Sequence, residues 1–120
     1  MASLQSYRLN SPAQFRQIAV SGKFLRAPSL SMKWLESPDG VCRFSFIVKK
    51  KQGNAVYRNR CRRILRPVFF DAAPHLALPV WAVVYVKEDF STMTSIALRD
   101  SANKLLSKLQ KKLLDSMESA

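Results

Sequence analysis

The segment from residue 49 to residue 66, KKKQGNAVYRNRCRRILR, contains the side chains best suited to chemistry in this sequence. Eight of its eighteen residues are Lys or Arg, and no acidic residue occurs between Asp39 and Asp71. A solvated helix face usually mixes in acidic residues, which pair with basic ones three or four positions away. The pattern therefore favours a surface that binds a polyanion over an ordinary solvated basic helix.

The basic residues in the second half of this segment are all arginines, five of them from Arg58 to Arg66. Guanidinium groups make paired hydrogen bonds to phosphates and stack on bases. Asn59, between two arginines, offers hydrogen bonds to base edges or sugar hydroxyls. These residue types indicate a nucleic-acid partner.

Residues able to catalyse a reaction are scarce. His75 is the only histidine, and the sequence indicates neither a Ser-His-Asp set nor a histidine metal cluster around it. A two-metal nuclease needs several carboxylates around ions roughly 4 Å apart. Only Glu88 and Asp89 are neighbours among the acidic residues, although folding can bring distant carboxylates together. We expect no catalytic residue and no metal site in the protein itself, so the positive charge must serve binding.

The bulk composition agrees with a nucleic-acid-binding domain. The chain has 120 residues and a net charge of +12, and 48% of its residues are hydrophobic. These values predict one folded domain over residues 1–120 with a negatively charged partner. No membrane partner is expected, because the longest apolar stretch, 76–86, is about half of the ~20 residues that a spanning helix needs. The N-terminus MASLQSYRLN lacks the features of a signal peptide, which predicts a cytoplasmic protein.

Cys42 and Cys61 match no metal spacing and are predicted to be buried thiols, with a disulfide or metal site as the alternative.

Several elements must position these side chains. NSPAQFRQIAVSG predicts a short helix that Ser11 caps, with Pro12 at its first position and Gly22 at its end. Its predicted apolar face contains Phe15, Ile18 and Ala19.

Two strands are predicted next. SLSMKWL (29–35) alternates apolar and polar residues, and VCRFSFIV (41–48) places Arg43 and Ser45 together on one face. The intervening SPDG (37–40) has the residues of a tight turn. The two strands are therefore expected to form an antiparallel hairpin.

The basic segment itself is predicted to form a helix from Ala55 toward Phe70, with Asn54 as its N-cap. Pro67 should kink or end this helix near Arg66, because proline removes a helix hydrogen bond. The residues expected to face the core are Tyr57, Cys61, Ile64 and Val68.

The C-terminal part supplies one more strand and one more helix. LPVWAVVYV (78–86) predicts a central strand buried on both faces. A long helix is predicted from Thr94 to Met117, with a stripe of apolar residues. The order of elements predicts an α+β fold, an α/β sandwich with one mostly four-stranded sheet and about three helices.

The basic segment resembles the signature of the bacterial ribonuclease P protein subunit. RLNSPAQF (8–15) is also similar to the family's entry into its first helix, and RFSFIVKKK (43–51) to the strand before the signature. The resemblance covers most of the chain, with weaker matching over 23–40 and 71–90. The signature positions are Lys50, Lys51, Gly53, Asn54, Ala55, Val56, Arg58, Asn59, Arg60, Arg62 and Arg63.

The resemblance implies that the signature helix joins two parallel strands by a left-handed crossover, against the general right-handed preference. It also implies a function. Proteins of this family bind a large catalytic RNA, and that RNA with Mg²⁺ removes the 5′ leader from precursor tRNA. The protein would then be a non-catalytic subunit, with Mg²⁺ bound mainly by RNA, and no DNA partner is expected.

The resemblance further implies two sets of binding residues. Phe15 would lie in a cleft between the first helix and the sheet, where a leader base could stack for ~1–3 kcal/mol. Arg43 would add positive charge there, and Ser45 is small enough to let the leader approach. Met32 and Trp34 are candidates for the cleft floor, with core packing as an equal alternative. The residues expected to contact the catalytic RNA are Arg58, Asn59, Arg60, Arg62, Arg63 and Arg66, with Lys50 and Lys51 near that RNA or the leader.

Three positions depart from the family pattern. Ala19 stands where a second aromatic residue is frequent, which predicts weaker stacking of the leader. Ser45 replaces a glycine. Pro67 stands where the helix usually continues with an acidic or amide residue, which leaves the length of the helix open.

Two other functions are compatible with the charge. A ribosomal protein or RNA chaperone with a similar basic helix would bind RNA without a role in cleavage. A protein-only nuclease would cleave RNA without any RNA subunit. Cleavage of precursor tRNA by the catalytic RNA, with and without the protein, separates these possibilities.

Overall fold

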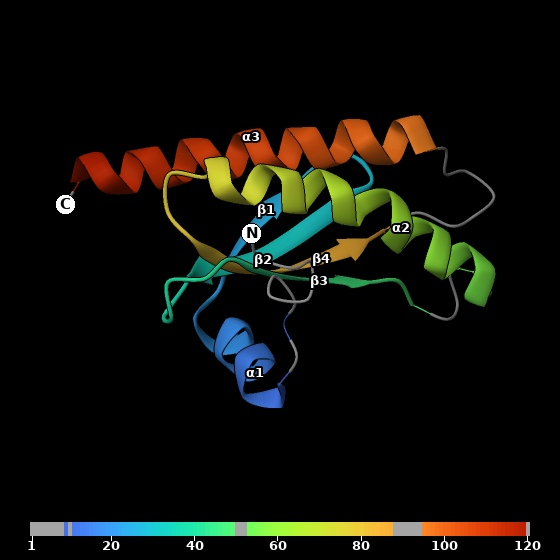
Figure 1. Ribbon diagram of the computed structural model, residues 1–120, viewed down its shortest axis with the longest axis horizontal. Helices are drawn as coiled ribbons and strands as arrows, with labels where there is room; N and C mark the ends of the chain where they lie inside the picture. The colour runs from blue at the N-terminus through green and yellow to red at the C-terminus, as the bar shows by residue number, and fades with distance from the viewer. Residues whose placement is uncertain (1–8, 10, 50–52, 88–94, 120) are drawn as a thin grey trace.

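The computed structural model describes residues 9, 11–49, 53–87 and 95–119. It confirms the predicted α+β fold with one four-stranded sheet (Figure 1). In chain order the elements are α1 (Pro12–Ser21), β1 (Lys23–Arg26), β2 (Leu30–Glu36), β3 (Arg43–Ile47), α2 (Ala55–Ala72), the short 3-10 helix η3 (Ala73–His75), β4 (Val80–Val86) and α3 (Ser95–Ser119).

The sheet is mixed, and its strand order is β1-β2-β4-β3. β2 is antiparallel to both β1 and β4, whereas β3 is parallel to β4. The predicted hairpin of 29–35 with 41–48 is therefore wrong, because β4 lies between β2 and β3. Six of the seven residues of β4 are buried. Such an apolar strand is most stable in the middle of a sheet, where both of its faces are covered, and the prediction of a central strand there is confirmed.

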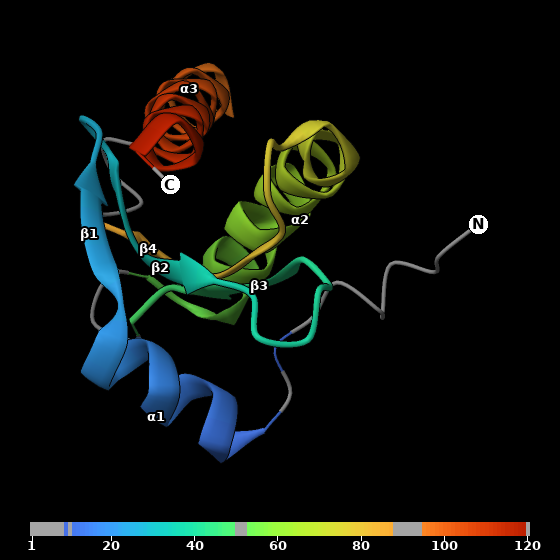
Figure 2. The same ribbon diagram turned by 90° about the vertical axis from the view of Figure 1, so that its left-hand side faces the viewer.

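The sheet has a helical layer on each face. Helices α2 and α3 cover one face, and α1 lies against the other (Figure 2). In the main core, Phe44 and Phe46 of β3 meet Phe69 and Phe70 of α2, with ring centroids 5.4 to 6.3 Å apart. A smaller core under α1 contains Leu9, Ile18, Trp81 and Val83.

The connection from β3 through α2 to β4 has an uncommon hand. β3 and β4 are neighbours and parallel. In Figure 2 both strands point away from the reader, and the chain passes from β3 up through α2 and back down to β4 on its left. This anticlockwise path is a left-handed crossover, as the family resemblance implied and against the usual preference.

Helix α1 has the predicted caps at both ends. Ser11 Oγ accepts a hydrogen bond from the Gln14 N–H at 3.2 Å, and Gln14 Oε1 accepts one from the Ser11 N–H at 3.3 Å. This reciprocal pair is a capping box. At the other end, a Cβ on Gly22 would lie 2.4 Å from the carbonyl oxygen of Ile18, so the close turn out of α1 requires glycine.

The apolar face of α1 is narrower than predicted. Ile18 is buried and Phe15 is half-buried, but Ala19 is exposed. The chain leaves α1 directly into β1, a four-residue edge strand that the sequence pattern did not predict. Only Leu25 of β1 is buried, and a strand this short carries too few alternations to be recognised.

The start of α2 confirms the predicted N-cap. Asn54 Oδ1 accepts a hydrogen bond from the Tyr57 N–H at 2.9 Å. The Tyr57 ring also lies against Gly53, where an added Cβ would be 2.3 Å from Tyr57 Cδ2. The Gly-Asn pair of the signature therefore serves the local geometry at the beginning of α2.

Helix α2 continues through Pro67 to Ala72, so the predicted helix from Ala55 toward Phe70 is confirmed and, of the two predicted effects of Pro67, an end near Arg66 does not occur. A proline inside a helix removes one hydrogen bond. The residues beyond it compensate, because Phe69 and Phe70 are 0% and 4% exposed and pack on β3. Burial of two aromatic rings contributes several kcal/mol in total, at about 1.5–3 kcal/mol each, and outweighs the proline.

The predictions of buried thiols and of an apolar stripe on α3 are confirmed. Cys42 and Cys61 are free, buried thiols, and burial raises the pKa of each. Within the described ranges, no helix has both the length and the apolar content to cross a membrane. The predicted apolar stripe of α3 is buried at Leu98, Ala102, Leu105, Leu109 and Leu113.

Candidate RNA interface

The outward surface of α2 carries the basic residues of the signature. Arg60 and Arg63 are exposed, whereas Cys61 and Leu65 on the opposite side are buried in the main core. The predicted inward residues Tyr57, Ile64 and Val68 pack against the same core. The remaining polar residues of this surface are Asn59, which is exposed, and Arg58, Arg62 and Arg66, which are half-buried.

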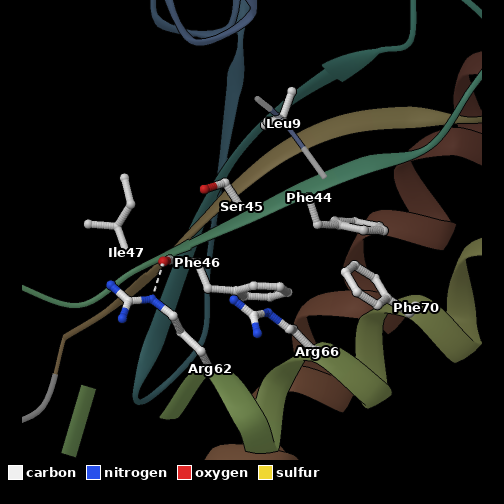
Figure 3. Close-up of a pocket in the computed structure, with 8 residues that line it drawn as sticks. All are labelled: Leu9, Phe44, Ser45, Phe46, Ile47, Arg62, Arg66 and Phe70. Carbon is white, nitrogen blue, oxygen red and sulfur yellow. Dashed lines mark hydrogen bonds between the residues drawn. The ribbon is translucent and has the colours of Figure 1, made fainter. Parts of the chain in front are cut away.

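Arg62 is held in a defined position between α2 and β3. Its Nε donates a hydrogen bond to the carbonyl oxygen of Phe46 at 3.3 Å, and its Nη1 donates one to Asn59 Oδ1 at 3.4 Å. Figure 3 shows this side chain extending from α2 to the backbone of β3. Within the described residues, Arg58 Nε is buried without a hydrogen-bond partner. The surface thus contains one guanidinium group, that of Arg62, in a defined position.

A pocket of about 370 Å³ opens between α2 and the outer edge of β3 (Figure 3). Arg62 and Arg66 approach it from α2, and Ser45 and Ile47 border it from the other face of β3. The pocket therefore connects the basic surface of α2 with the opposite face of the sheet. Its full lining is Leu9, Phe44, Ser45, Phe46, Ile47, Arg62, Arg66 and Phe70.

A second hollow of about 380 Å³ lies on the outward side of α2. Three guanidinium groups surround it, and such groups bind anions such as phosphate. Its lining is Asn59, Arg62, Arg63, Arg66 and Pro67.

The other candidate surface is the sheet face that α1 partly covers. Register places Ser45 beside Val83 and Ile47 beside Tyr85 on this face. Phe15 of α1 packs, half-buried, against the small core there. The structure thus brings Phe15, Ser45 and Arg43 to one side of the sheet, which is the arrangement that the predicted cleft requires.

Arg43 contributes less positive charge to this face than predicted. Its Nε lies 3.1 Å from Asp39 Oδ2 in an ion pair. Asp39 Oδ1 also accepts hydrogen bonds from Ser37, Val41 and Trp81. Partial burial would raise the pKa of Asp39, but the hydrogen bonds from Ser37, Val41, Arg43 and Trp81 outweigh it and lower the pKa to about 2. Asp39 is therefore charged near neutral pH and offsets Arg43.

Two predicted cleft residues lie on the wrong face. Met32 and Trp34 are 0% and 5% exposed and belong to the main core under α2 and α3. Side chains alternate along β2, so Ser31, Lys33 and Leu35 face α1 instead. The alternative of core packing is confirmed for Met32 and Trp34, and they cannot form the cleft floor.

Lys33, Phe24 and Tyr85 were missed as candidate residues on the α1 side of the sheet. The alternation of β2 places Met32 and Trp34 on one face and Lys33 on the other. The sequence pattern could therefore have identified Lys33 as a candidate. The predictions for Lys50 and Lys51 lie outside the described residues.

The described acidic, histidine and cysteine residues include no group of three or more that could share a metal ion. His75 is exposed at the end of η3, and its carbonyl oxygen accepts a hydrogen bond from Gln110. These arrangements offer anion binding through guanidinium groups rather than acid–base chemistry.

The fold and the two surfaces define a small, strongly basic α/β sandwich that presents an arginine-bearing helix on one side and a partly open sheet face on the other. The family model of Ribonuclease P matches residues 4–110. The chain therefore belongs to the ribonuclease P protein family.

Individual relatives agree with this assignment. The ribonuclease P protein component of Roseiflexus castenholzii is 33% identical over 82 residues, which cover 68% of this chain and 66% of that protein. The component from Gluconacetobacter diazotrophicus is 41% identical over 63 residues, covering 52% of this chain and 54% of that protein. The chain thus spans between half and two thirds of the length of these curated relatives. The structure of the Staphylococcus aureus RNase P protein superposes with a TM-score of 0.77 at 25% identity, covering 85% of this chain and 94% of that one.

Proposed function

We infer that the protein is the protein subunit of ribonuclease P, the RNA-based endoribonuclease that removes the 5′ leader from precursor tRNA. The observation that carries this proposal is the arginine surface of α2 in a chain of this family. Arg60 and Arg63 are exposed, and Arg62 is fixed at the edge of the sheet. We assign to this surface the contact with the catalytic RNA, together with Lys50 and Lys51 from the preceding segment.

The physical basis of this contact is electrostatic. No acidic residue lies between Asp39 and Asp71 in the sequence, and RNA phosphates can supply the negative charge that neutralises these arginines. Each neutralised phosphate releases condensed counterions, which makes binding tight at low salt and weaker as salt rises. The A-form geometry of RNA exposes phosphates and 2′-hydroxyl groups that Arg and Asn side chains can contact.

The single-stranded leader is assigned to the face of the sheet beside α1. Phe15 offers a half-buried aromatic ring there, and Ser45 leaves room for a backbone to approach. Stacking of a base on such a ring contributes about 1–3 kcal/mol. Arg43 is paired with Asp39, so in this cleft contact with the bases should matter more than the charge of Arg43.

The proposal assigns Mg²⁺ to RNA rather than to the protein. Mg²⁺ prefers oxygen ligands in octahedral geometry and is usually held by few carboxylates together with phosphates. The described residues offer no cluster that fits it, and the Asp39 carboxylate already accepts four hydrogen bonds. The protein would therefore hold and orient the RNA partners, while the ion stays on RNA. In the cell, both RNA partners would meet the protein in the cytoplasm.

The test is multiple-turnover cleavage of a precursor tRNA by a bacterial ribonuclease P RNA at low Mg²⁺. It is run with and without the protein, beside a control that contains the protein alone. Correct cleavage at the mature 5′ end should depend on both components. Cleavage by the protein alone would overturn the proposal in favour of a protein nuclease. Tight RNA binding without any effect on cleavage would favour a ribosomal or chaperone-like protein.

A further inference from the structure

Phe24 has a solvent-exposed aromatic side chain. It lies on the edge strand β1 and is 59% exposed. Among the large apolar side chains exposed in the described ranges, it is the one aromatic residue. An exposed aromatic ring forgoes the stabilisation that burial provides, so its position calls for a partner.

The ring is held beside a fixed cation. Lys33 Nζ lies 5.2 Å from the centroid of the Phe24 ring and donates a hydrogen bond to the carbonyl oxygen of Ala19 at 2.7 Å. That carbonyl is in the last turn of α1, where carbonyl groups lack helical donors and favour positive charge. A Cβ on Gly22 would lie 2.9 Å from Lys33 Cγ, so glycine allows the chain to pass this closely. Phe24, Lys33 and the end of α1 thus form one ordered arrangement.

This arrangement lies on the same face of the sheet as the proposed leader cleft. Phe24 is opposite Lys33, Lys33 is opposite Val83, and Val83 is opposite Ser45. At about 4.8 Å between strands, this row crosses the sheet over roughly 14 Å. Figure 2 shows α1 beneath the sheet, with its C-terminal end leading into β1 at the sheet edge. Phe24 is therefore at the β1 end of the face whose β3 end contains Ser45.

The next row of residues on this face remains accessible to solvent. It contains Arg26, which is exposed, and Ser31, Tyr85 and Ile47, which are half-buried. The open surface thus continues from β3 to β1 alongside α1. At its β1 end this surface carries the positive charge of Arg26, whereas Lys23, opposite Trp34, faces the other side of the sheet.

We propose that Phe24 and Lys33 form a binding subsite for one unpaired nucleotide of the RNA strand that lies between α1 and the sheet. The base stacks on the open side of the Phe24 ring, and the adjoining phosphate is neutralised by Lys33 and Arg26. Stacking accepts any base, because each has a flat π-face. α1 supplies no ring at this end, since Ala19 and Val20 are exposed aliphatic residues, so β1 provides it. This subsite rests on the proposed function and extends the leader path to the sheet edge.

The test combines Phe24→Ala with precursor tRNAs that carry one abasic nucleotide at successive leader positions. Affinity is measured for the assembled complex of protein and catalytic RNA. One abasic position should weaken binding to the wild-type complex about fivefold or more. The same abasic position should cost little in the Phe24→Ala complex, because the ring that it would have stacked on is absent. Phe24→Trp, which keeps a stacking surface, should restore the dependence, and Val20→Ala should behave as wild type.

The outcomes separate this inference from the proposed function. If the wild-type protein does not promote cleavage at all, both fail. If it promotes cleavage but the effects of Phe24→Ala and of every abasic position are additive, only the subsite is overturned. Concentration-dependent self-association that Phe24→Ala abolishes, without any coupling to the leader, would instead assign the ring to a contact between copies of the chain. Coupling at one position, lost in Phe24→Ala and kept in Phe24→Trp, supports the subsite.

Discussion

Arg62 Nε lies 3.3 Å from the carbonyl oxygen of Phe46, so that α2 donates a side-chain hydrogen bond to the outer edge of β3. Among the described strands, β3 pairs with β4 alone and forms the sheet edge, and an edge strand leaves part of its backbone without partners. The bond therefore satisfies an edge carbonyl and also fixes the guanidinium in space. A side chain held in this way loses less conformational entropy when it binds a phosphate.

The first prediction concerns Arg60 and Arg62. Replacement of both by Ala should weaken binding of the catalytic RNA at least about tenfold at physiological salt, because hydrogen bonds to charged groups contribute about 1.5–3 kcal/mol each. Each lost phosphate contact should also make the dependence of log K on log salt shallower by about 1. Filter binding over a range of salt concentrations measures both quantities.

A matched control for this experiment lies on α3. Lys104 and Lys112 are exposed, and their double replacement by Ala removes the same charge from another surface. That variant should change RNA affinity much less. Equal losses in the two double variants would contradict the assignment of α2 to the catalytic RNA, because net charge alone would then explain the binding.

Phe15 should act on the leader rather than on the catalytic RNA. Phe15→Ala should weaken binding of precursor tRNAs with long leaders about fivefold or more, through lost stacking, and leave those with very short leaders nearly unchanged. Phe15→Leu keeps most of the packing on the small core but removes the ring, so it distinguishes stacking from folding. The measurement is the affinity of the assembled complex for a series of leader lengths. Equal effects at all leader lengths would show that Phe15 acts only as a core residue.

Asp39 should make the free energy of unfolding depend on pH in the acid range. Its pKa is lowered from the ordinary value of 3.8 to about 2 by hydrogen bonds from Ser37, Val41, Arg43 and Trp81, which outweigh partial burial. Because the pKa is lower in the folded state, the carboxylate stabilises the protein fully above about pH 4 and loses this contribution as the pH falls toward 2. The site is partly exposed, so the contribution should be only about 1 kcal/mol.

Urea denaturation of wild type and Asp39→Asn at several pH values tests this dependence. The variant should be less stable than wild type by that amount at pH 7, and the difference should shrink as the pH is lowered through the acid range. A constant difference between the two proteins at all pH values would show that the carboxylate charge is not what stabilises the turn.

Local signals in the sequence predicted local structure well. The caps at Ser11 and Asn54 are confirmed because each depends on residues within three positions of the helix start. The division of α2 into a core side and a basic side is confirmed for the same reason, since a helix repeats over a few residues. These features required no knowledge of what lies far away in the chain.

The errors arose where distant segments decide the outcome. Alternation in β2 shows that Met32 and Trp34 share a face, but not which face. That choice depends on which side α3 covers, and α3 follows β2 in the chain by about sixty residues. The predicted hairpin failed because β4, from later in the chain, pairs with both β2 and β3. The left-handed crossover came from the family resemblance alone, since the general rule predicts the opposite hand.

Pro67 provides the last prediction, because α2 continues through it. Proline has no N–H to donate to the carbonyl of Arg63, four residues earlier. Pro67 is exposed, so Pro67→Ala removes little packing while it restores that hydrogen bond. The free energy of unfolding should rise by about 1–3 kcal/mol, as measured by urea denaturation.

Pro12→Ala is the matched control, because proline suits the first position of α1, and it should bring no gain. Affinity for the catalytic RNA should stay close to wild type, since the arginines around Pro67 remain. A stable variant that binds the RNA poorly would instead show that proline gives the hollow between Arg63 and Arg66 a shape that binds a phosphate of the RNA.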